Sequence, residues 1–286
     1  MINTVKHLSY KLKFDFKEIQ SIIRNIDNFY GERIEIKTDK FGNPKLDGQG
    51  NKKKRIINPS KKRLKILQKR IHKSILNEIK MPDYAFGAIK RRDNVDNSKK
   101  HQGKKYKFTT DLKDFFPSIT NEAVFKMFVS QRFSPTVARI LTQLTTFKGK
   151  IPQGAPTSST VANLVFIKTG DILNKFSKEN SITFTSFVDD MTFSSAKDFK
   201  SKIPAILEVI TNDYRISHKK TFYSRNPNIT GLHPMNNHLK LPKSFMAKLE
   251  STENKTPQQI AGLEMYKKKV IQTNYPKKPV ANGYSK

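Results

Sequence analysis

Two adjacent aspartates, Asp189 and Asp190, lie in the segment TSFVDDMTFSS, whose other residues are apolar or carry hydroxyl groups. Neighbouring carboxylates repel each other, and burying them is unfavourable unless a positive charge compensates. The stretches on either side read as half-buried strands, which predicts a tight hairpin with the two acids at its tip. Turn acids usually come with Gly or Asn, whereas Val188 and Met191 flank this pair. A partly buried, cation-binding tip therefore competes with the alternative of a solvated turn.

A third acid, Asp111, ends the strand-like segment KFTTDL, 78 residues before Asp189. Alone it could equally be a helix-capping or turn residue. Together, a strand-end aspartate and a hairpin-tip pair can hold two divalent ions about 3.5–4 Å apart, one activating a 3′-hydroxyl and one holding a triphosphate. The chain has no Cys and 6 His, so a hard, oxygen-bound cation such as Mg²⁺ is favoured over structural zinc. We expect two Mg²⁺ ions at these acids.

The charge of the chain points to the partner. Lys and Arg number 55 against 24 Asp and Glu, for a formal net charge of +31, which predicts a polyanion and most often a nucleic acid. A membrane surface would attract the same charge. However, the sequence contains no long apolar run and no signal-peptide core, so we expect no membrane partner. The absence of Cys fits a reducing, cytoplasmic location.

The elements that must position the acids mix helices with short strands, which indicates an α+β fold rather than a regular βαβ array. Helices are expected over residues 17–30, 60–80, 134–147, 157–178 and 198–214, and strands at ERIEIKT, KKKRIINP, KFTTDL, SITFTSFV and MTFSS. The first two strands would form a long basic hairpin. The expected helix N-caps are Ser60 and either Thr157 or Ser158. Residues 90–107 are expected to be a loop.

Three segments in this order, DLKDFFPSI, IPQGAPTSSTVANL and FVDD, resemble the motifs of the reverse transcriptase palm. More closely, the chain resembles bacterial retron reverse transcriptases. NSKKH (residues 97–101) is similar to the N-A-x-x-H motif of that family, ITG (residues 229–231) to its V-T-G motif, and RIINPSKKRLKILQKRI to its fingers segment. The chain departs from the family at Phe187, where Tyr is usual, and at Val188 and Ser98, where Ala is usual.

The resemblance implies an α+β right-hand polymerase with fingers, palm and a small thumb, whose palm sheet is antiparallel and RRM-like. The expected division is fingers over residues 1–105, palm with interleaved fingers helices over 106–232, and a short thumb with a basic tail over 233–286.

The resemblance also implies roles for individual residues. Asp111, Asp189, Asp190 and Lys220 would be catalytic, with the acids and Leu112 at the metals and Lys220 (or nearby Lys219) assisting the pyrophosphate leaving group. The residues expected to bind the incoming dNTP are Arg55, Phe116, Gln153 and Gly154, with Phe116 as a steric gate against ribonucleotides. Those expected to bind RNA or DNA are Asn97, His101, Thr230, Gly231, Lys61 and Arg63. Asn97 and His101 could instead brace the palm.

The resemblance implies RNA-directed DNA synthesis on a structured noncoding RNA, giving an RNA–DNA hybrid (msDNA) in antiphage defence. An effector protein is an expected further partner. Two alternatives stay open: a defence or abortive-infection reverse transcriptase without a retron RNA, and a catalytically silent RNA-binding scaffold in which the acids are turns. An RNA-dependent RNA polymerase shares the paired aspartates, and Phe116 argues against it.

Overall fold

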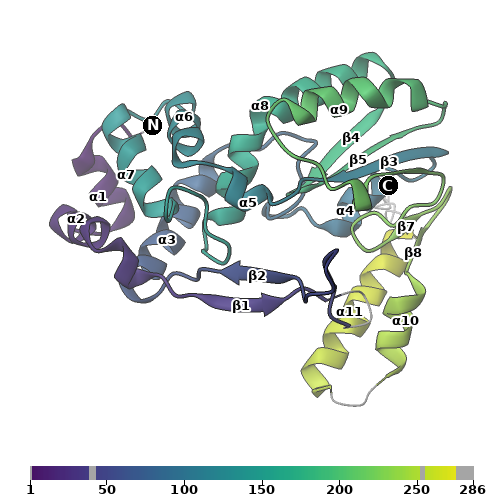
Figure 1. The fold of residues 1–286 in the computed structure, drawn as a ribbon, viewed down its shortest axis with the longest axis horizontal. Helices are drawn as coiled ribbons and strands as arrows, with labels where there is room; N and C mark the ends of the chain where they lie inside the picture. Colours follow the sequence, from purple (N-terminus) through teal and green to yellow (C-terminus); the bar gives the residue numbers. More distant parts are fainter. Residues whose placement is uncertain (1, 39–42, 252–254, 275–286) are drawn as a thin grey trace, which may run out of the picture.

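The fold is known from a computed structural model that describes residues 2–38, 43–251 and 255–274. Its centre is a four-stranded antiparallel sheet with the strand order β4-β5-β3-β6 (Figure 1). The strands are β3 (Tyr106–Asp111), β4 (Thr183–Phe187), β5 (Asp190–Ser195) and β6 (Phe222–Ser224). The expected strands at KFTTDL, SITFTSFV and MTFSS are thereby confirmed, as is the mixed α+β class.

The two faces of this sheet differ in chemistry because successive side chains point to opposite sides. On one face the rings of Phe108, Phe184 and Phe193 pack together in the core. Helices α8 (Ser158–Glu179) and α9 (Ile203–Thr211) cover this apolar face (Figure 1). The opposite face carries Asp111 and Asp190, and only part of it is covered, by α4 (Asn94–Lys99) and the chain around it.

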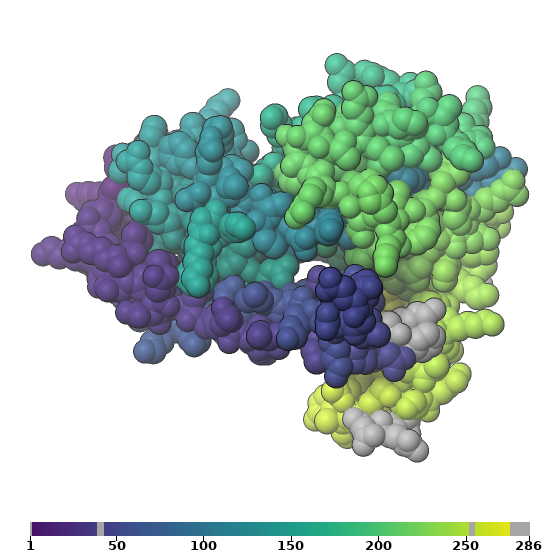
Figure 2. Space-filling view, in the orientation of Figure 1, coloured from purple at the N-terminus to yellow at the C-terminus, as the bar shows by residue number. Residues whose placement is uncertain are grey.

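A helical body stands beside the sheet, at the left of Figure 1. Its helices are α1 (Val5–Leu12), α2 (Phe16–Arg24), α3 (Lys62–Ser74), α6 (Asn121–Ser130) and α7 (Pro135–Thr145). Helix α3 packs on both α1 and α7, so segments from before and after β3 share one core. From this body the predicted basic hairpin, β1 (Arg33–Ile36) and β2 (Lys54–Ile57), runs beneath the sheet. Figure 2 shows the opening that it leaves against the palm.

The C-terminal region forms a third, smaller unit. It contains the short pair β7 (His233–Pro234) and β8 (Leu239–Lys240), followed by α10 (Lys243–Glu250) and α11 (Pro257–Asn274). Its own buried core consists of Val95, Leu232, Leu239 and Val270, of which Val95 comes from α4. The predicted basic tail beyond Asn274 lies outside the described residues.

Several local predictions are wrong. The helix expected over 60–80 is α3 followed by a separate 3₁₀ turn (Leu76–Glu78), and its N-cap is Lys61. The hydroxyl of Ser60 is buried and accepts no helix N–H among the described residues. Thr157 is the N-cap residue of α8, but its side chain makes no capping hydrogen bond, and the Ser158 hydroxyl donates instead to the Pro152 carbonyl.

The loop expected over 90–107 contains α4. A capping box starts this helix: the Asp93 side chain accepts the N–H of Asp96, and the Asp96 side chain accepts that of Asp93. This pattern is a helix-start signal that lies in the sequence, although the following six-residue helix has little apolar periodicity of its own. Tyr84 and Phe86 also form backbone hydrogen bonds with Ser186 of β4, so this segment of the expected fingers packs against the palm sheet. The expected division into fingers, palm and thumb stays a prediction.

Candidate active site

The paired aspartates lie at the β4–β5 turn, as the sequence predicts. Val188 takes the left-handed conformation (φ 59°) to close this turn. Gly87 allows the chain to pass beneath it, because a Cβ at Gly87 would come within 2.8 Å of the Val188 nitrogen. On the neighbouring strand Asp111 is directly opposite Asp190, and the Leu112 N–H donates to the Asp189 carbonyl at 2.9 Å. Strand pairing thus brings together acids that are far apart in the chain.

Asp111, Asp189 and Asp190 form an acidic triad. One carboxylate oxygen from each lies within 4.8 Å of the others, and Asp111 is buried, Asp189 half-buried and Asp190 exposed. Desolvation and the charge of Asp111 raise the pKa of Asp189. Desolvation of its carboxylate, with the charges of Asp189 and Asp111, raises the pKa of Asp190 to about 7. The repulsion among the three carboxylates therefore favours a bound proton or cation at the triad.

The triad suits hard cations. Three convergent carboxylates supply oxygen ligands of the kind Mg²⁺ prefers, and their mutual repulsion is what bound cations would relieve. Leu112, the fourth expected ligand, has a buried side chain without donor atoms, so only its backbone carbonyl could take part. Among the described residues, no other group of three or more His, Cys, Asp or Glu residues is arranged to hold a metal ion.

Positive charge reaches the triad from two elements. The ammonium of Lys220, in a 3₁₀ turn before β6, donates to an Asp111 carboxylate oxygen at 2.5 Å. Partial burial opposes the charged form, but this hydrogen bond and the nearby carboxylates raise the pKa of Lys220, so it stays protonated. Its bond to Asp111 distinguishes it from Lys219. From β2, the charge of Arg55 acts on Asp189 and favours its ionised form.

A cleft of about 1370 Å³ separates the hairpin from the palm. Its walls include Arg55 and Lys54 from the hairpin and Asp111 and Lys220 from the palm. Lysines and arginine outnumber acids along the cleft, and Asp111 of the triad reaches it from the palm, which suits a substrate that carries both metal-bound and free phosphate oxygens.

The loop that carries Gln153 and Gly154 packs against the base of the hairpin. The Asn58 N–H donates to the Gln153 carbonyl at 2.7 Å. Gly154 has φ 99°, and a Cβ there would lie 2.6 Å from the Ile57 methyl, so only glycine fits. Phe116, five residues after Asp111, is half-buried against Phe115. That Gln153, Gly154 and Phe116 contact the dNTP stays a prediction.

For Asn97 and His101 the sequence left two roles open, binding of RNA and bracing of the palm. Both residues are buried. The two ring nitrogens of His101 bond at 2.7 Å to the hydroxyls of Ser194 on β5 and Thr185 on β4. Desolvation, with the charges of Lys107 and Lys104, lowers the pKa of His101 to about 3, so the ring is neutral. Of the two roles left open, bracing the palm sheet is the one that this geometry supports.

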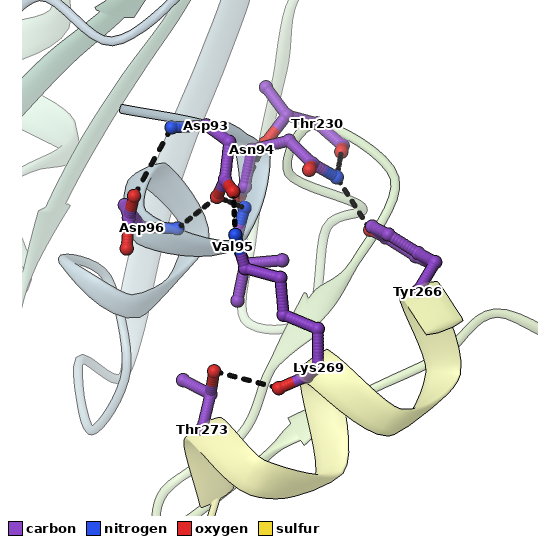
Figure 3. Close-up of polar contacts among 8 residues, drawn as sticks. All are labelled: Asp93, Asn94, Val95, Asp96, Thr230, Tyr266, Lys269 and Thr273. Carbon is purple, nitrogen blue, oxygen red and sulfur yellow. Dashed lines mark hydrogen bonds and ion pairs between the residues drawn. The ribbon is translucent and has the colours of Figure 1, made fainter. Parts of the chain in front are cut away.

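Thr230 lies at a joint between palm and thumb (Figure 3), and Gly231 follows it in the chain. The Asn94 amide donates to the Thr230 carbonyl at 2.9 Å and to the Tyr266 hydroxyl of α11 at 2.6 Å. Lys269 of α11 pairs with Asp93. Thr230 (φ 46°) and Gly231 (φ 92°) both have left-handed backbones, which makes this a tight turn against α4. The turn therefore has a structural role beside the nucleic-acid contact expected of it.

The remaining predicted nucleic-acid residues differ in availability. Lys61 is exposed at the start of α3. Arg63 is partly engaged within the protein: it bonds to Glu18 at 2.5 Å and lies over the Phe14 ring. Sequence reasoning missed Gly87, Asn163, Thr185 and Ser194. Asn163 bonds to the Gly87 carbonyl and so holds the chain under the turn. Asn163 lies in the motif IPQGAPTSSTVANL, and this motif was the sequence signal that could have identified it.

The fold has the arrangement of a right-hand polymerase, with the triad at the end of the palm strands. A family model for reverse transcriptase (RNA-dependent DNA polymerase) matches residues 37–234. The chain therefore belongs to the reverse transcriptase family, and its similarity to curated proteins is to the bacterial retron type. No helix in the described part of the chain is long and apolar enough to cross a membrane.

Three relatives illustrate this similarity. Retron Se72 reverse transcriptase from Salmonella heidelberg (strain 579083-10) is 33% identical over 221 residues, which cover 76% of this chain and 55% of the relative. Retron Ec86 reverse transcriptase from Escherichia coli is 30% identical over 154 residues, which cover 54% of this chain and 48% of the relative. Retron Mx162 reverse transcriptase from Myxococcus xanthus is 31% identical over 172 residues, which cover 54% of this chain and 35% of the relative. The matches thus span about half or less of each relative.

Proposed function

We propose that the protein is an RNA-directed DNA polymerase that uses two Mg²⁺ ions. The observation that carries the proposal is the acidic triad: Asp111 faces Asp190 across paired strands, Asp189 closes the hairpin tip beside them, and their oxygens converge within 4.8 Å. Membership of the reverse transcriptase family supports the same chemistry.

In the proposed reaction the 3′-oxygen of a growing strand forms a bond to the α-phosphorus of a dNTP. The bond from that phosphorus to its bridging oxygen breaks, and pyrophosphate leaves. The bound cations would lower the pKa of the 3′-hydroxyl and neutralise the charge of the phosphates. Asp111 and Asp189 would hold both ions and Asp190 would assist. The 3′-hydroxyl proton goes to solvent, and protonated Lys220 donates to, or holds the charge of, the departing pyrophosphate.

The fingers supply the second half of the nucleotide site. Arg55 faces the triad across the cleft and would neutralise the triphosphate. Gln153 and Gly154 would lie beside the base, and the Phe116 ring would exclude a 2′-hydroxyl by steric clash. Substitution of Phe116 by Ala is then expected to admit ribonucleotides, which would also separate this enzyme from an RNA polymerase.

We further propose that the template is a dedicated structured noncoding RNA. Relatives named as retron reverse transcriptases and the net charge of +31 support this assignment. By analogy with the retron type, a 2′-hydroxyl within that RNA would prime synthesis, and the product would be a branched RNA–DNA hybrid that acts in antiphage defence, with an effector as a possible partner. A cytoplasmic location accords with this role and stays a prediction.

The test is to purify the protein from cells that carry its native locus and to treat the bound nucleic acid with RNase and DNase separately. The Asp189→Asn protein is purified in parallel, and Asp114→Asn, which alters an exposed acid outside the triad, is the matched control. We expect DNA joined to RNA from the wild-type and control proteins and RNA alone from Asp189→Asn. RNA alone from all three would favour the RNA-binding scaffold, and DNA without attached RNA would point to a reverse transcriptase outside the retrons.

A further inference from the structure

The strand register arranges the catalytic face of the palm in rows, because directly paired residues of antiparallel strands point to the same side. The first row holds Asp111 and Asp190, with Phe187 beside them. The next row, two residues along the strands, crosses all four of them. It consists of Phe222 on β6, Thr109 on β3, Thr192 on β5 and Thr185 on β4.

Phe222 is the one large side chain in this second row, and it is 55% exposed. Its neighbour Tyr223 points to the opposite face, where it packs edge-on against Phe199. The core of the sheet therefore does not need the ring of Phe222. An exposed aromatic ring beside short threonines, next to a catalytic centre, is a surface on which a flat or apolar part of a ligand can pack.

Two features indicate that this ligand is the end of a nucleic acid strand. Two residues of a strand span about 6.8 Å, so the second row lies about two base-pair rises from the triad. In addition, Lys219 and Lys220, which line the cleft, precede Phe222 in the chain and supply positive charge for phosphates. A hydrogen bond of 2.9 Å between the Thr221 and Thr110 hydroxyls fixes the segment that leads into the ring.

We propose that Phe222 packs against the last one or two nucleotides of the growing DNA strand and holds its 3′ end at the triad. This rests on the proposed polymerase function and makes Phe222 a positioning residue for the primer, separate from the dNTP. Within the row, Thr192 and Thr185 are buried and Thr109 is half-buried, so the ring of Phe222 is the part of the row that a ligand can reach. The aromatic ring supplies contact area without sequence preference, since every nucleotide offers an apolar sugar face and a base face.

The test compares Phe222→Ala with Phe222→Tyr, which keeps the ring, and with Ile172→Ala, which removes an equally exposed apolar side chain (49% exposed) from α8 on the far face. Two quantities are measured: single-nucleotide incorporation on a primed RNA template, with primer–template and dNTP varied in turn, and the affinity for a fluorescent RNA–DNA hybrid by anisotropy. Thermal unfolding is followed for every variant.

Phe222→Ala is expected to raise the KM for primer–template and weaken hybrid binding about tenfold, with the KM for dNTP unchanged. Phe222→Tyr should keep the KM for primer–template and the hybrid affinity close to those of the wild type, and Ile172→Ala should match the wild type in both quantities. Unchanged hybrid affinity in Phe222→Ala, an effect confined to the dNTP, or a lowered unfolding temperature that explains the loss would each overturn the proposal. If the wild type incorporates no nucleotide, the polymerase function fails, and the anisotropy measurement still decides whether Phe222 holds a hybrid end.

Discussion

The acidic triad and the thumb joint are both built from residues distant in the chain, but they are held in place differently. The triad is fixed by strand pairing on both sides of β5 and by a core that includes the fully buried rings of Phe108 and Phe193. The thumb rests on a four-residue core and on polar contacts at the surface, Asn94 to Tyr266 and Asp93 to Lys269.

This difference matches what each region is expected to do. Catalytic oxygens must be held close to one geometry, since small displacements at a reacting centre cost large factors in rate. A thumb that follows a lengthening duplex has no single geometry to keep, and contacts worth little individually allow it to shift. Changes in the triad should therefore abolish chemistry, whereas changes at the joint should alter how long the enzyme stays on its template.

The largest effect is expected from Asp189→Asn. Loss of a carboxylate ligand should lower incorporation by about 10³-fold or more, because charge neutralisation carries most of phosphoryl-transfer catalysis. The substitution also removes a carboxylate whose pKa is raised, so metal-free protein should unfold at an equal or higher temperature. Incorporation assays and thermal unfolding measure the two effects. A large loss of thermal stability would mean that Asp189 is a structural residue of the turn.

Lys220→Ala should come next, with incorporation lowered by about 10²-fold, the lower end for loss of a positioned general acid. Lys219→Ala is the matched control, since it removes a neighbouring positive charge without touching the Asp111 hydrogen bond. Steady-state incorporation at saturating dNTP distinguishes them. Equal losses in the two variants would reduce Lys220 to part of a general basic surface.

The brace under the catalytic hairpin predicts a pH effect on folding. The pKa of His101 falls to about 3 in the folded protein, against an ordinary value near 6.5. At His101 the folded state therefore binds fewer protons, so the contribution of this residue to stability should be constant above about pH 6.5 and fall below it, by up to about 1.4 kcal/mol per pH unit. His101→Gln, which can keep both hydroxyl partners, should lack this component. Denaturant unfolding from pH 7 to 5 compares the two, and parallel profiles would contradict the assignment.

The smallest effect is expected at the thumb joint. Tyr266→Phe removes the hydroxyl that accepts from Asn94, at a cost of about 1 kcal/mol to the joint, or roughly fivefold in its closed population. Product length per binding event should shorten a few-fold while single-nucleotide incorporation stays unchanged. Product length is measured on sequencing gels in the presence of excess unlabelled template, which traps enzyme that has dissociated. Phe245→Leu on α10 is the control for altered packing. A matching loss of single-nucleotide incorporation would show that the joint also shapes the active site.

The sequence alone determined the chemistry of this protein. The three aspartates lie in local patterns of strand and turn, which predicted three strands of the palm. Their motifs, with the segment IPQG between them, indicated the family. Both kinds of signal depend on residues near one another in the chain.

The tertiary structure decided what depends on long-range packing. Pairing register set Asp111 opposite Asp190 and turned Phe222 toward the catalytic face, while burial made His101 a brace instead of an RNA contact. Helix α4, too short to have a marked apolar period, is stabilised by its capping box and by packing on β4 and the thumb core. Register and burial arise from contacts between distant segments, and no local pattern contains them.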